Sequence, residues 1–368
     1  MNAKRCWVEV DLDALRHNAR VVREKVGRSA HIMAIVKANA YGHGMSQVAT
    51  ALSAEVAMFG VANLDEALVL RNACIQNEIY ILGPALPEER RQIVASGFIA
   101  AISNFEEAEA FAHSVPGRSA RGHLVIDTGM GRMGLWHEEA IGIARAILRL
   151  PNLEIGGVAT HLPMADEDQS YTEGQLGVFE TLLGQLREAG LTAPQIHVLN
   201  SAGVLAFASQ AQTLVRAGLM LYGSSPLPAF QEELRPSLAF KTRVTLVREL
   251  GPGRSVSYGR TFITAEPRRV ATIGAGYADG FPRHLSNAGE VLVGGRRCPV
   301  IGRVTMDQIL VDVSALREVV VGQEVVLIGR QGEQEILAAE LARKAGTIAW
   351  EIFTGIGPRV KRVYCPRP

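Results

Sequence analysis

The stretch HIMAIVKANAYGHG, residues 31–44, joins a short apolar run to a lysine and a polar turn. The run IMAIV is typical of a buried strand, so Lys37 stands where that strand ends. Two explanations fit a lysine in this position. Its ammonium group can extend along the apolar surface to water. Alternatively, partial burial can keep its amine reactive, so that it forms a Schiff base with an aldehyde. The position of Lys37 alone does not decide between them.

Four further apolar runs also end in polar residues or glycine turns. Arg132 follows the run GHLVID, and His161 ends the run VATH. Asn200 and Ser201 end the run HVLNS, and the run LVRAGL contains Arg216, Gly218 and Leu219. A single residue of this kind is usually structural, but five such strand ends favour a site. The last two strands of a barrel often end at a phosphate-binding site. A lysine that reacts with an aldehyde, together with a phosphate site, indicates pyridoxal 5'-phosphate.

Strand-like runs and helical stretches alternate over about residues 30–220. The runs are HIMAIVK, AMFGVAN, IYILG, FIAAIS, GHLVID, LEIGGVATH, IHVLNS and TLVRAG. This alternation predicts a (β/α)8 barrel, whose functional residues lie at the C-terminal ends of the strands. An open doubly wound sheet is the alternative, but no GxGxxG sequence follows the first strand.

The pattern changes near residue 235. Short β-branched runs separated by glycine follow, such as VATIGAGY, EVLVGG and QILVDVS, and they predict a mostly β domain with one late helix, ILAAELARKAG. We therefore predict a barrel domain at 9–234 and a β domain at 235–368. A strand within residues 1–8 has no preceding helix and is expected to pack with the β domain.

Composition excludes several classes of protein. The 368 residues carry a formal net charge of +1, which gives no electrostatic basis for binding nucleic acid. No apolar run is long enough for a membrane span, and the N-terminus does not have the pattern of a signal peptide. The four cysteines form no CxxC or Cys/His pattern, so we expect free thiols, a cytoplasmic protein and no metal site.

Seven motifs occur in a fixed order through nearly the whole chain: AIVKANAYGHG, DTGMGRMGL, NSAG, VRAGLMLYG, SVSYGRTF, GYADGFPR and GRVTMDQILVDV. They resemble the motifs of the alanine racemase family, which are fold-type III pyridoxal-phosphate enzymes. The resemblance implies a barrel followed by a β domain. It also implies interconversion of L-alanine and D-alanine, for cell-wall synthesis or catabolism, by a homodimer with shared active sites.

The resemblance further implies roles for individual residues. Lys37 resembles the lysine that holds the cofactor and acts as one catalytic base, and Tyr258 resembles the opposing base from the other subunit. Arg132 resembles the arginine near that tyrosine and the substrate carboxylate. His161 resembles the histidine that links the tyrosine to Arg216, and Arg216 resembles the arginine that donates to the pyridine nitrogen.

The remaining matched positions resemble binding contacts. Phosphate contacts match Tyr41, Ser201, Gly218 and Leu219. Tyr277 matches a tyrosine at the substrate entrance and phosphate side. Met306 matches a partner-subunit residue whose backbone amide contacts the substrate carboxylate.

The chemistry suits these residue types. Racemisation removes a proton from one face of Cα and returns one to the other, so it needs two bases. A free tyrosine has a pKa of about 10, and Arg132 and His161 can favour its phenolate. An arginine keeps its proton and leaves the pyridine nitrogen unprotonated, which favours return of the proton to Cα over transamination.

Two positions depart from the family pattern. Many members have a carbamylated lysine beside the arginine of GMGR, but this chain has Val125 there, and it has Pro358 where some members have a tyrosine. Three alternatives remain open. One is a racemase for serine or for a broader set of amino acids, another is a non-catalytic pyridoxal-phosphate carrier, and the third is a fold-type III decarboxylase for a basic amino acid. A carrier would need no second base at Tyr258.

Overall fold

The computed structural model describes residues 4–207 and 212–365. These residues form two compact units. The barrel unit contains Leu15–Ala40 and Met45–Leu234, and the β unit contains the N-terminal segment up to Ala14, Tyr41–Gly44 and the chain from Arg235 onward. The limits 9–234 and 235–368 stay predictions for the domain boundaries.

Among the described residues, eight parallel strands make the barrel: β2 (His31–Ile35), β3 (Met58–Val61), β4 (Glu78–Ile81), β5 (Ile99–Ile102), β6 (Ala120–Asp127), β8 (Leu153–Ala159), β9 (Gln195–His197) and β10 (Leu214–Ala217). They pair in the order β10-β2-β3-β4-β5-β6-β8-β9, and the short β7 (Leu135–Trp136) adds to β6. Hydrogen bonds from Thr213 N–H, just before β10, to Ile196 C=O (3.2 Å) and from Arg216 N–H to Leu199 C=O, just after β9 (2.9 Å), join the segments of β9 and β10. The predicted barrel is confirmed.

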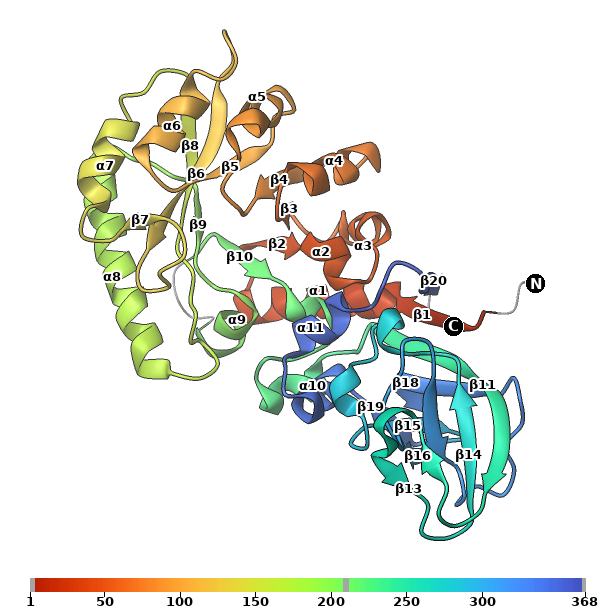
Figure 1. The fold of residues 1–368 in the computed structure, drawn as a ribbon. Coiled ribbons are helices and arrows are strands. Elements are labelled where there is room, and N and C mark those ends of the chain that lie inside the picture. Colours follow the sequence, from red (N-terminus) through yellow and green to blue (C-terminus); the bar gives the residue numbers. More distant parts are fainter. Residues whose placement is uncertain (1–3, 208–211, 366–368) are drawn as a thin grey trace. The chain divides into compact units, whose positions relative to one another are not determined.

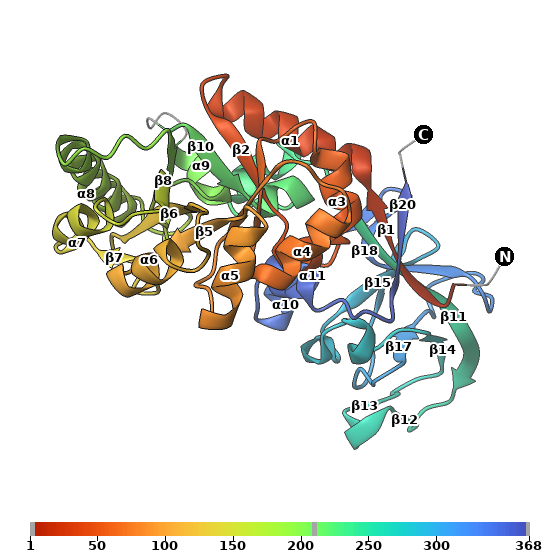
Figure 2. The ribbon, with the colours of Figure 1, turned by 90° about the horizontal axis from the view of Figure 1, so that it is seen from above.

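Helices surround these strands, as Figures 1 and 2 show: α1 (Leu12–Val26), α3 (Met45–Leu52), α4 (Leu64–Asn72), α5 (Pro87–Ala95), α6 (Phe105–Ala112), α7 (Ala140–Ile147), α8 (Gln169–Glu188) and α9 (Ser201–Phe207). Because helices cover the outside and side chains fill the inside, strands such as β3 and β5 are buried along their whole length. This explains why the sequence shows continuous apolar runs there instead of alternation.

Two of these helices begin with the same sequence pattern, Asn-x-x-Glu. The side chains of Asn63 and Asn104 accept hydrogen bonds from the backbone N–H groups of Glu66 (3.1 Å) and Glu107 (2.7 Å), which caps α4 and α6. An N-cap asparagine satisfies a donor that the helix itself leaves unpaired. The pattern therefore sets where each helix begins at the C-terminal end of the barrel.

The β unit is built mainly from strands, as predicted: β1 (Cys6–Asp11), β11 (Leu238–Leu250), β14 (Arg268–Ile273), β15 (Glu290–Val293), β16 (Arg296–Pro299), β17 (Ile309–Asp312), β18 (Glu324–Gln331), β19 (Gln334–Ile336) and β20 (Lys361–Cys365). The strand β1 pairs antiparallel with β11 and parallel with β20. A separate hairpin joins β12 (Ser255–Val256) to β13 (Phe262–Ile263). Helices α10 (Ala338–Ala345) and α11 (Ala349–Thr354) complete the unit. No helix in the described segments is long and apolar enough to cross a membrane.

An ionic cluster ties α10 to β15 and β16. Arg297 donates two hydrogen bonds to Glu340 (2.6 and 2.9 Å), and Lys344 contacts Glu290 (2.6 Å). The hydrogen bond from Arg297 lowers the pKa of Glu340, and the one from Lys344 lowers the pKa of Glu290. A carboxylate whose folded pKa is lowered stabilises the fold at neutral pH and loses this effect as the pH falls.

We predict that Glu340→Gln lowers the free energy of unfolding of the β unit by about 1 to 2 kcal/mol at pH 7, because it removes a bidentate charged hydrogen bond. The loss shrinks as the pH falls through the folded pKa of Glu340, where the wild type also loses the charge. Urea unfolding of both proteins between pH 3 and 7 measures this. The control Glu266→Gln removes a mostly exposed ion pair with Arg268, and an equal loss there would contradict the prediction.

Candidate active site

Lys37 lies two residues after the end of β2, at the C-terminal end of the barrel, and its side chain is half-buried. Residues 38–41 then have φ values between 51° and 55°, so the segment α2 (Lys37–Tyr41) is a left-handed turn. Burial and the positive charge of Arg132 lower the pKa of Lys37, and the negative charge of Glu66 partly opposes this. A lower pKa increases the fraction of neutral amine, which is the form that attacks an aldehyde or accepts a proton.

Arg216 on β10 is the centre of a hydrogen-bond network inside the barrel, and only 5% of it is exposed. Its two terminal nitrogens donate to the carbonyl oxygens of Thr160 (2.7 Å), His197 (2.6 Å) and Val198 (2.9 Å). They also donate to Nδ1 of His197 (2.9 Å) and Nδ1 of His161 (3.1 Å). Within the described part of the chain, its Nε–H donates to no protein atom.

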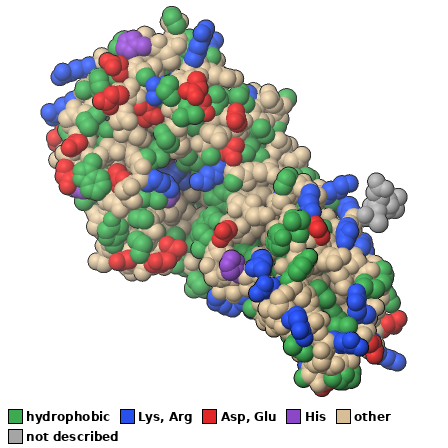
Figure 3. Space-filling view, in the orientation of Figure 1, with side chains coloured by type: hydrophobic (Ala, Val, Ile, Leu, Met, Phe, Trp, Pro, Cys, Tyr) green, Lys and Arg blue, Asp and Glu red, His purple; other side chains and the backbone are tan. Residues whose placement is uncertain are grey.

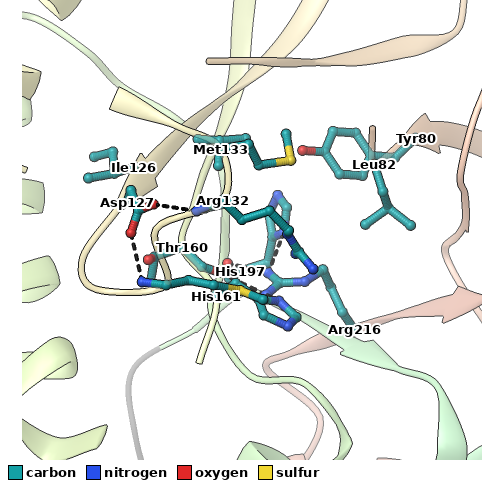
Figure 4. A pocket seen from close by; sticks show the side chains of 13 residues that line it. Tyr80, Leu82, Ile126, Asp127, Arg132, Met133, Thr160, His161, His197 and Arg216 are labelled. Atoms are coloured by element: carbon teal, nitrogen blue, oxygen red, sulfur yellow. Dashed lines mark hydrogen bonds between the residues drawn. The ribbon is translucent and has the colours of Figure 1, made fainter. Parts of the chain in front are cut away.

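Arg216, Arg132, His161 and His197 line one cavity at this end of the barrel, where Figure 4 shows them gathered. Figure 3 shows Lys and Arg side chains collected in a hollow on the surface of the barrel unit. Burial lowers the pKa of Arg216 to about 10, so the guanidinium stays protonated at neutral pH. The cavity therefore has a cationic lining with a buried group that only donates hydrogen bonds.

The network also fixes the protonation of the histidines. Because Arg216 donates to Nδ1 of His197, Nε2 of His197 carries the proton and donates to Nδ1 of His123 (2.9 Å). By the same reasoning Nε2 of His161 carries its proton. Burial, together with neighbouring arginines, lowers the pKa of His123 and of His161 to about 3, and burial lowers that of His197 well below its usual value. All three rings are therefore neutral at pH 7.

Arg132 lies in the loop after β6, which Asp127 holds in place. The Asp127 carboxylate accepts backbone N–H groups from Gly129 (2.9 Å), Met130 (2.8 Å) and Arg132 (3.1 Å). Burial opposes the ionisation of Asp127, but these hydrogen bonds outweigh it and lower its pKa. In the part of the chain that the structure describes, the Arg132 guanidinium pairs with no carboxylate, and Val125, which also lines the cavity, cannot be carbamylated.

Ser201, Gly218 and Leu219 come together beside the ends of β9 and β10. The Ser201 hydroxyl oxygen accepts the backbone N–H groups of Gly218 (3.0 Å) and Met220 (3.3 Å). Ser201 and Leu219 are both buried. Because the Ser201 oxygen accepts these two bonds, its hydroxyl proton is left to donate, and a hydroxyl beside a backbone turn at this end of a barrel is a usual donor to a phosphate.

The other matched residues, Tyr41, Tyr258, Tyr277 and Met306, belong to the β unit. Burial raises the pKa of Tyr41 to about 12, and its hydrogen bond with Trp350 opposes the increase. The other three line one groove of the β unit and are 73%, 42% and 52% exposed. These four residues therefore belong to the β unit, whereas Lys37, Arg132, His161, Ser201 and Arg216 belong to the barrel unit.

The loop that carries Tyr258 is held in an unusual conformation. Ser257 has φ 62° and donates from its hydroxyl to the carbonyl oxygen of Arg303 (2.6 Å). Gly259 has φ 72°, in the region that glycine adopts most easily. A large, exposed aromatic side chain on a fixed, strained loop is typical of a residue that acts on something outside its own unit.

Comparison with known proteins gives the family of the chain. Residues 10–226 match the family described as "Alanine racemase, N-terminal domain", and residues 237–364 match "Alanine racemase, C-terminal domain". A curated alanine racemase of Symbiobacterium thermophilum is 44% identical over 97% of this chain and 96% of that protein. The chain belongs to the alanine racemase family.

Solved alanine racemases have the same fold. The enzyme of Bacillus anthracis with bound L-Ala-P has a TM-score of 0.91 at 38% identity, covering 98% of this chain and 95% of that one. The enzyme of Clostridium difficile 630 has a TM-score of 0.94 at 32% identity, covering 100% and 97%.

Alanine racemases depend on pyridoxal phosphate, and the barrel unit fits this cofactor. Arg216 offers one unused N–H, on Nε, to a ring nitrogen that must accept. Lys37 has the lowered pKa that an aldehyde-binding lysine needs, and the Ser201 hydroxyl, which accepts backbone N–H groups through its oxygen, can donate its proton to a phosphate. These features come from the chain's own hydrogen bonds and burial.

Three residues that support the cavity, His123, His197 and Asp127, were not among the residues predicted from the sequence. The predicted residues lie at strand ends, whereas His123 and His197 lie within the predicted strands GHLVID and IHVLNS. A histidine inside an apolar strand was the available signal, because a buried polar group needs a partner. The Asp127 loop had no comparable signal, because its carboxylate binds only nearby backbone groups.

We predict that the racemase takes up protons on unfolding near pH 5, with the three neutral histidines contributing. Their folded pKa values lie below the unfolded value of about 6.5, so this stability is complete above that pH and is lost as the pH falls. His123→Gln reduces the pH slope of the unfolding free energy by about one proton, or about 1.4 kcal/mol per pH unit.

Urea unfolding at closely spaced pH values from 4.5 to 7 measures this slope. His31→Gln is the control, because His31 is exposed at the start of β2 and has no part in the network. An unchanged slope in His123→Gln would mean that His123 is already protonated in the folded protein.

Proposed function

We propose that this protein interconverts L-alanine and D-alanine with pyridoxal phosphate, using Lys37 and Tyr258 of a second subunit as bases on opposite faces of Cα. The observation that carries the proposal is the Arg216 network, because it holds a permanent donor inside the barrel whose Nε–H has no acceptor in the segments that the structure describes. An aminotransferase needs a protonated ring nitrogen, which a carboxylate would favour and an arginine disfavours.

Within this proposal the bound cofactor supplies one thing: it withdraws electrons from Cα and so makes the Cα proton acidic. Lys37, with its lowered pKa, holds or releases a proton on one face of the substrate. Arg216 orients the ring nitrogen and keeps it unprotonated. His161 keeps a proton on Nε2, so it can donate to the Tyr258 oxygen and favour the phenolate.

The remaining matched residues bind the cofactor phosphate or the substrate carboxylate. We assign Ser201, Gly218 and Leu219 to the phosphate, with Tyr41 and Tyr277 as further contacts. Arg132 attracts the substrate carboxylate, and the backbone N–H of Met306 of the second subunit donates to it. Val125 removes the carbamate that many relatives place beside this arginine, so Arg132 works without a covalent anionic partner.

We further propose a homodimer that completes each site from two chains, with domain limits near 9–234 and 235–368. The support is the exposure of Tyr258, at 73%, on a loop whose backbone is already fixed. A catalytic tyrosine this exposed would be poorly shielded from water in a single chain. The described cysteines are free thiols, which agrees with our proposal of a cytoplasmic enzyme.

We predict that the purified protein is yellow, forms D-alanine from L-alanine and exchanges the Cα hydrogen with solvent without releasing carbon dioxide. Lys37→Ala loses the visible absorption band and reduces activity by at least about a thousandfold, because one base and the covalent attachment are both lost. Chiral chromatography, with a panel of L-amino acids including serine, measures activity and breadth. Attachment of the cofactor to another lysine after borohydride reduction would contradict the assignment.

We also predict complementation between two inactive variants, Lys37→Ala and Tyr258→Phe. In a mixed dimer one site carries both substitutions and the other carries neither. Half of randomly paired dimers are mixed, so activity should return to about a quarter of wild type. Refolding the two variants together, with each variant refolded alone as the control, measures this. Mixed dimers without activity would contradict the shared site.

A further inference from the structure

Glu66, in the first turn of α4, bonds to two backbone segments of the barrel unit. One carboxylate oxygen accepts the N–H of Ala38 (2.7 Å) and the other accepts the N–H of Ala62 (2.7 Å). Ala62 follows β3, and Ala38 is the residue immediately after Lys37. A single carboxylate thus joins the end of β3 to the start of the left-handed turn.

That turn needs such support. Residues 38–41 are alanine, asparagine, alanine and tyrosine, and all four have positive φ, a conformation that costs free energy for any residue with a Cβ. Other hydrogen bonds also hold the turn. They run from Ala40 N–H to Val36 C=O (2.7 Å), from Met45 N–H to the Asn39 side chain (2.9 Å) and from the His43 ring to Tyr41 C=O (2.9 Å). Of these contacts, only the one to Glu66 involves a carboxylate, and it bonds the residue immediately after Lys37.

The barrel contains the same arrangement at a place without a catalytic lysine. Glu107 occupies the same position in the second Asn-x-x-Glu pattern and accepts the N–H of Ser103 (2.8 Å), with a second backbone hydrogen bond from Ala85. Each glutamate therefore bonds its own strand end and the loop after another strand. The loop that Glu66 bonds contains Lys37, whereas the loop that Glu107 bonds contains no lysine beside Ala85.

We propose that Glu66 is a positioning residue for Lys37, whose carboxylate holds the left-handed turn and so orients the lysine at the mouth of the barrel. The link to racemisation rests on the function proposed above, whereas the hold on the turn does not.

The charge of Glu66 has a second effect on the lysine. The charged or titratable groups that act on Lys37 are Arg132 from the β6–β7 loop, Glu66 from α4 and the neutral His161 after β8. Arg132 and burial lower the pKa of Lys37, and Glu66 raises it. Glu66 therefore sets the position of Lys37 and limits how far its pKa falls.

Hydrogen–deuterium exchange on the holoenzyme tests the positioning role. Glu66→Gln keeps one acceptor and loses the other, so amides in residues 36–44 should exchange at least about tenfold faster than in the wild type. Glu107→Gln, the matched control, should leave these amides unchanged. Unchanged exchange in Glu66→Gln, or equal acceleration in both variants, would overturn the proposal.

The pH dependence of kcat separates the two effects. In Glu66→Gln the acid limb moves to lower pH, because Lys37 loses the neighbouring negative charge, and in Glu107→Gln it does not move. Glu66→Asp keeps the charge but is too short to reach both N–H groups, so it speeds exchange without moving the limb. A wild type without racemase activity would overturn the proposed function, while the exchange data would still decide the role of Glu66.

Discussion

The site depends on one buried cation, the guanidinium of Arg216. A charge held inside a barrel is costly unless acceptors surround it, and the protein supplies three backbone carbonyls and two histidine nitrogens. This need for acceptors determines the protonation state of the neighbouring histidines. A histidine that accepts from arginine cannot also be protonated on that nitrogen, so the positive charge is not shared and the rings stay neutral. Among the described residues the Nε–H of Arg216 has no acceptor, so it is the N–H that Arg216 can present to a ligand.

The protonation state of Lys37 depends on opposing effects on its pKa. Burial and Arg132 favour its neutral amine, and Glu66 favours its ammonium form. The same glutamate supports the strained turn that begins at Ala38, so geometry and charge at the lysine are coupled through one carboxylate. Arg132, in turn, is presented by a loop that Asp127 holds by its backbone, which leaves the guanidinium itself unpaired by protein carboxylates among the described residues.

The two units contribute in different ways. The barrel unit carries a lysine, an arginine and neutral histidines around a cavity, whereas the β unit carries tyrosines and a methionine on an exposed groove. In the function proposed above, Lys37 of the barrel unit is one base and Tyr258 of a second subunit is the other. Tyr258 is exposed on a hairpin that the Ser257 hydrogen bond to Arg303 anchors.

The sequence by itself determined the alternation of strands and helices, the change to a β domain near residue 235, and the strand ends that carry Lys37, His161 and Arg216. These features follow from local patterns: buried parallel strands are short apolar runs, and barrel function lies where they end. The family motifs also come from the sequence, because each is a contiguous stretch. None of this required knowledge of which strands are neighbours.

Only the tertiary structure decided what those residues touch. The contact between His197 and His123 joins positions 74 residues apart, and the one between Arg216 and His161 joins positions 55 apart. The hydrogen bond between Glu66 and the backbone of Ala38 likewise joins positions 28 residues apart. The tautomers and the neutral state of the rings follow from the contacts of the histidines. They depend on which side chains share the interior of a closed sheet, and on how strongly that interior excludes water, neither of which is a property of any local stretch of sequence.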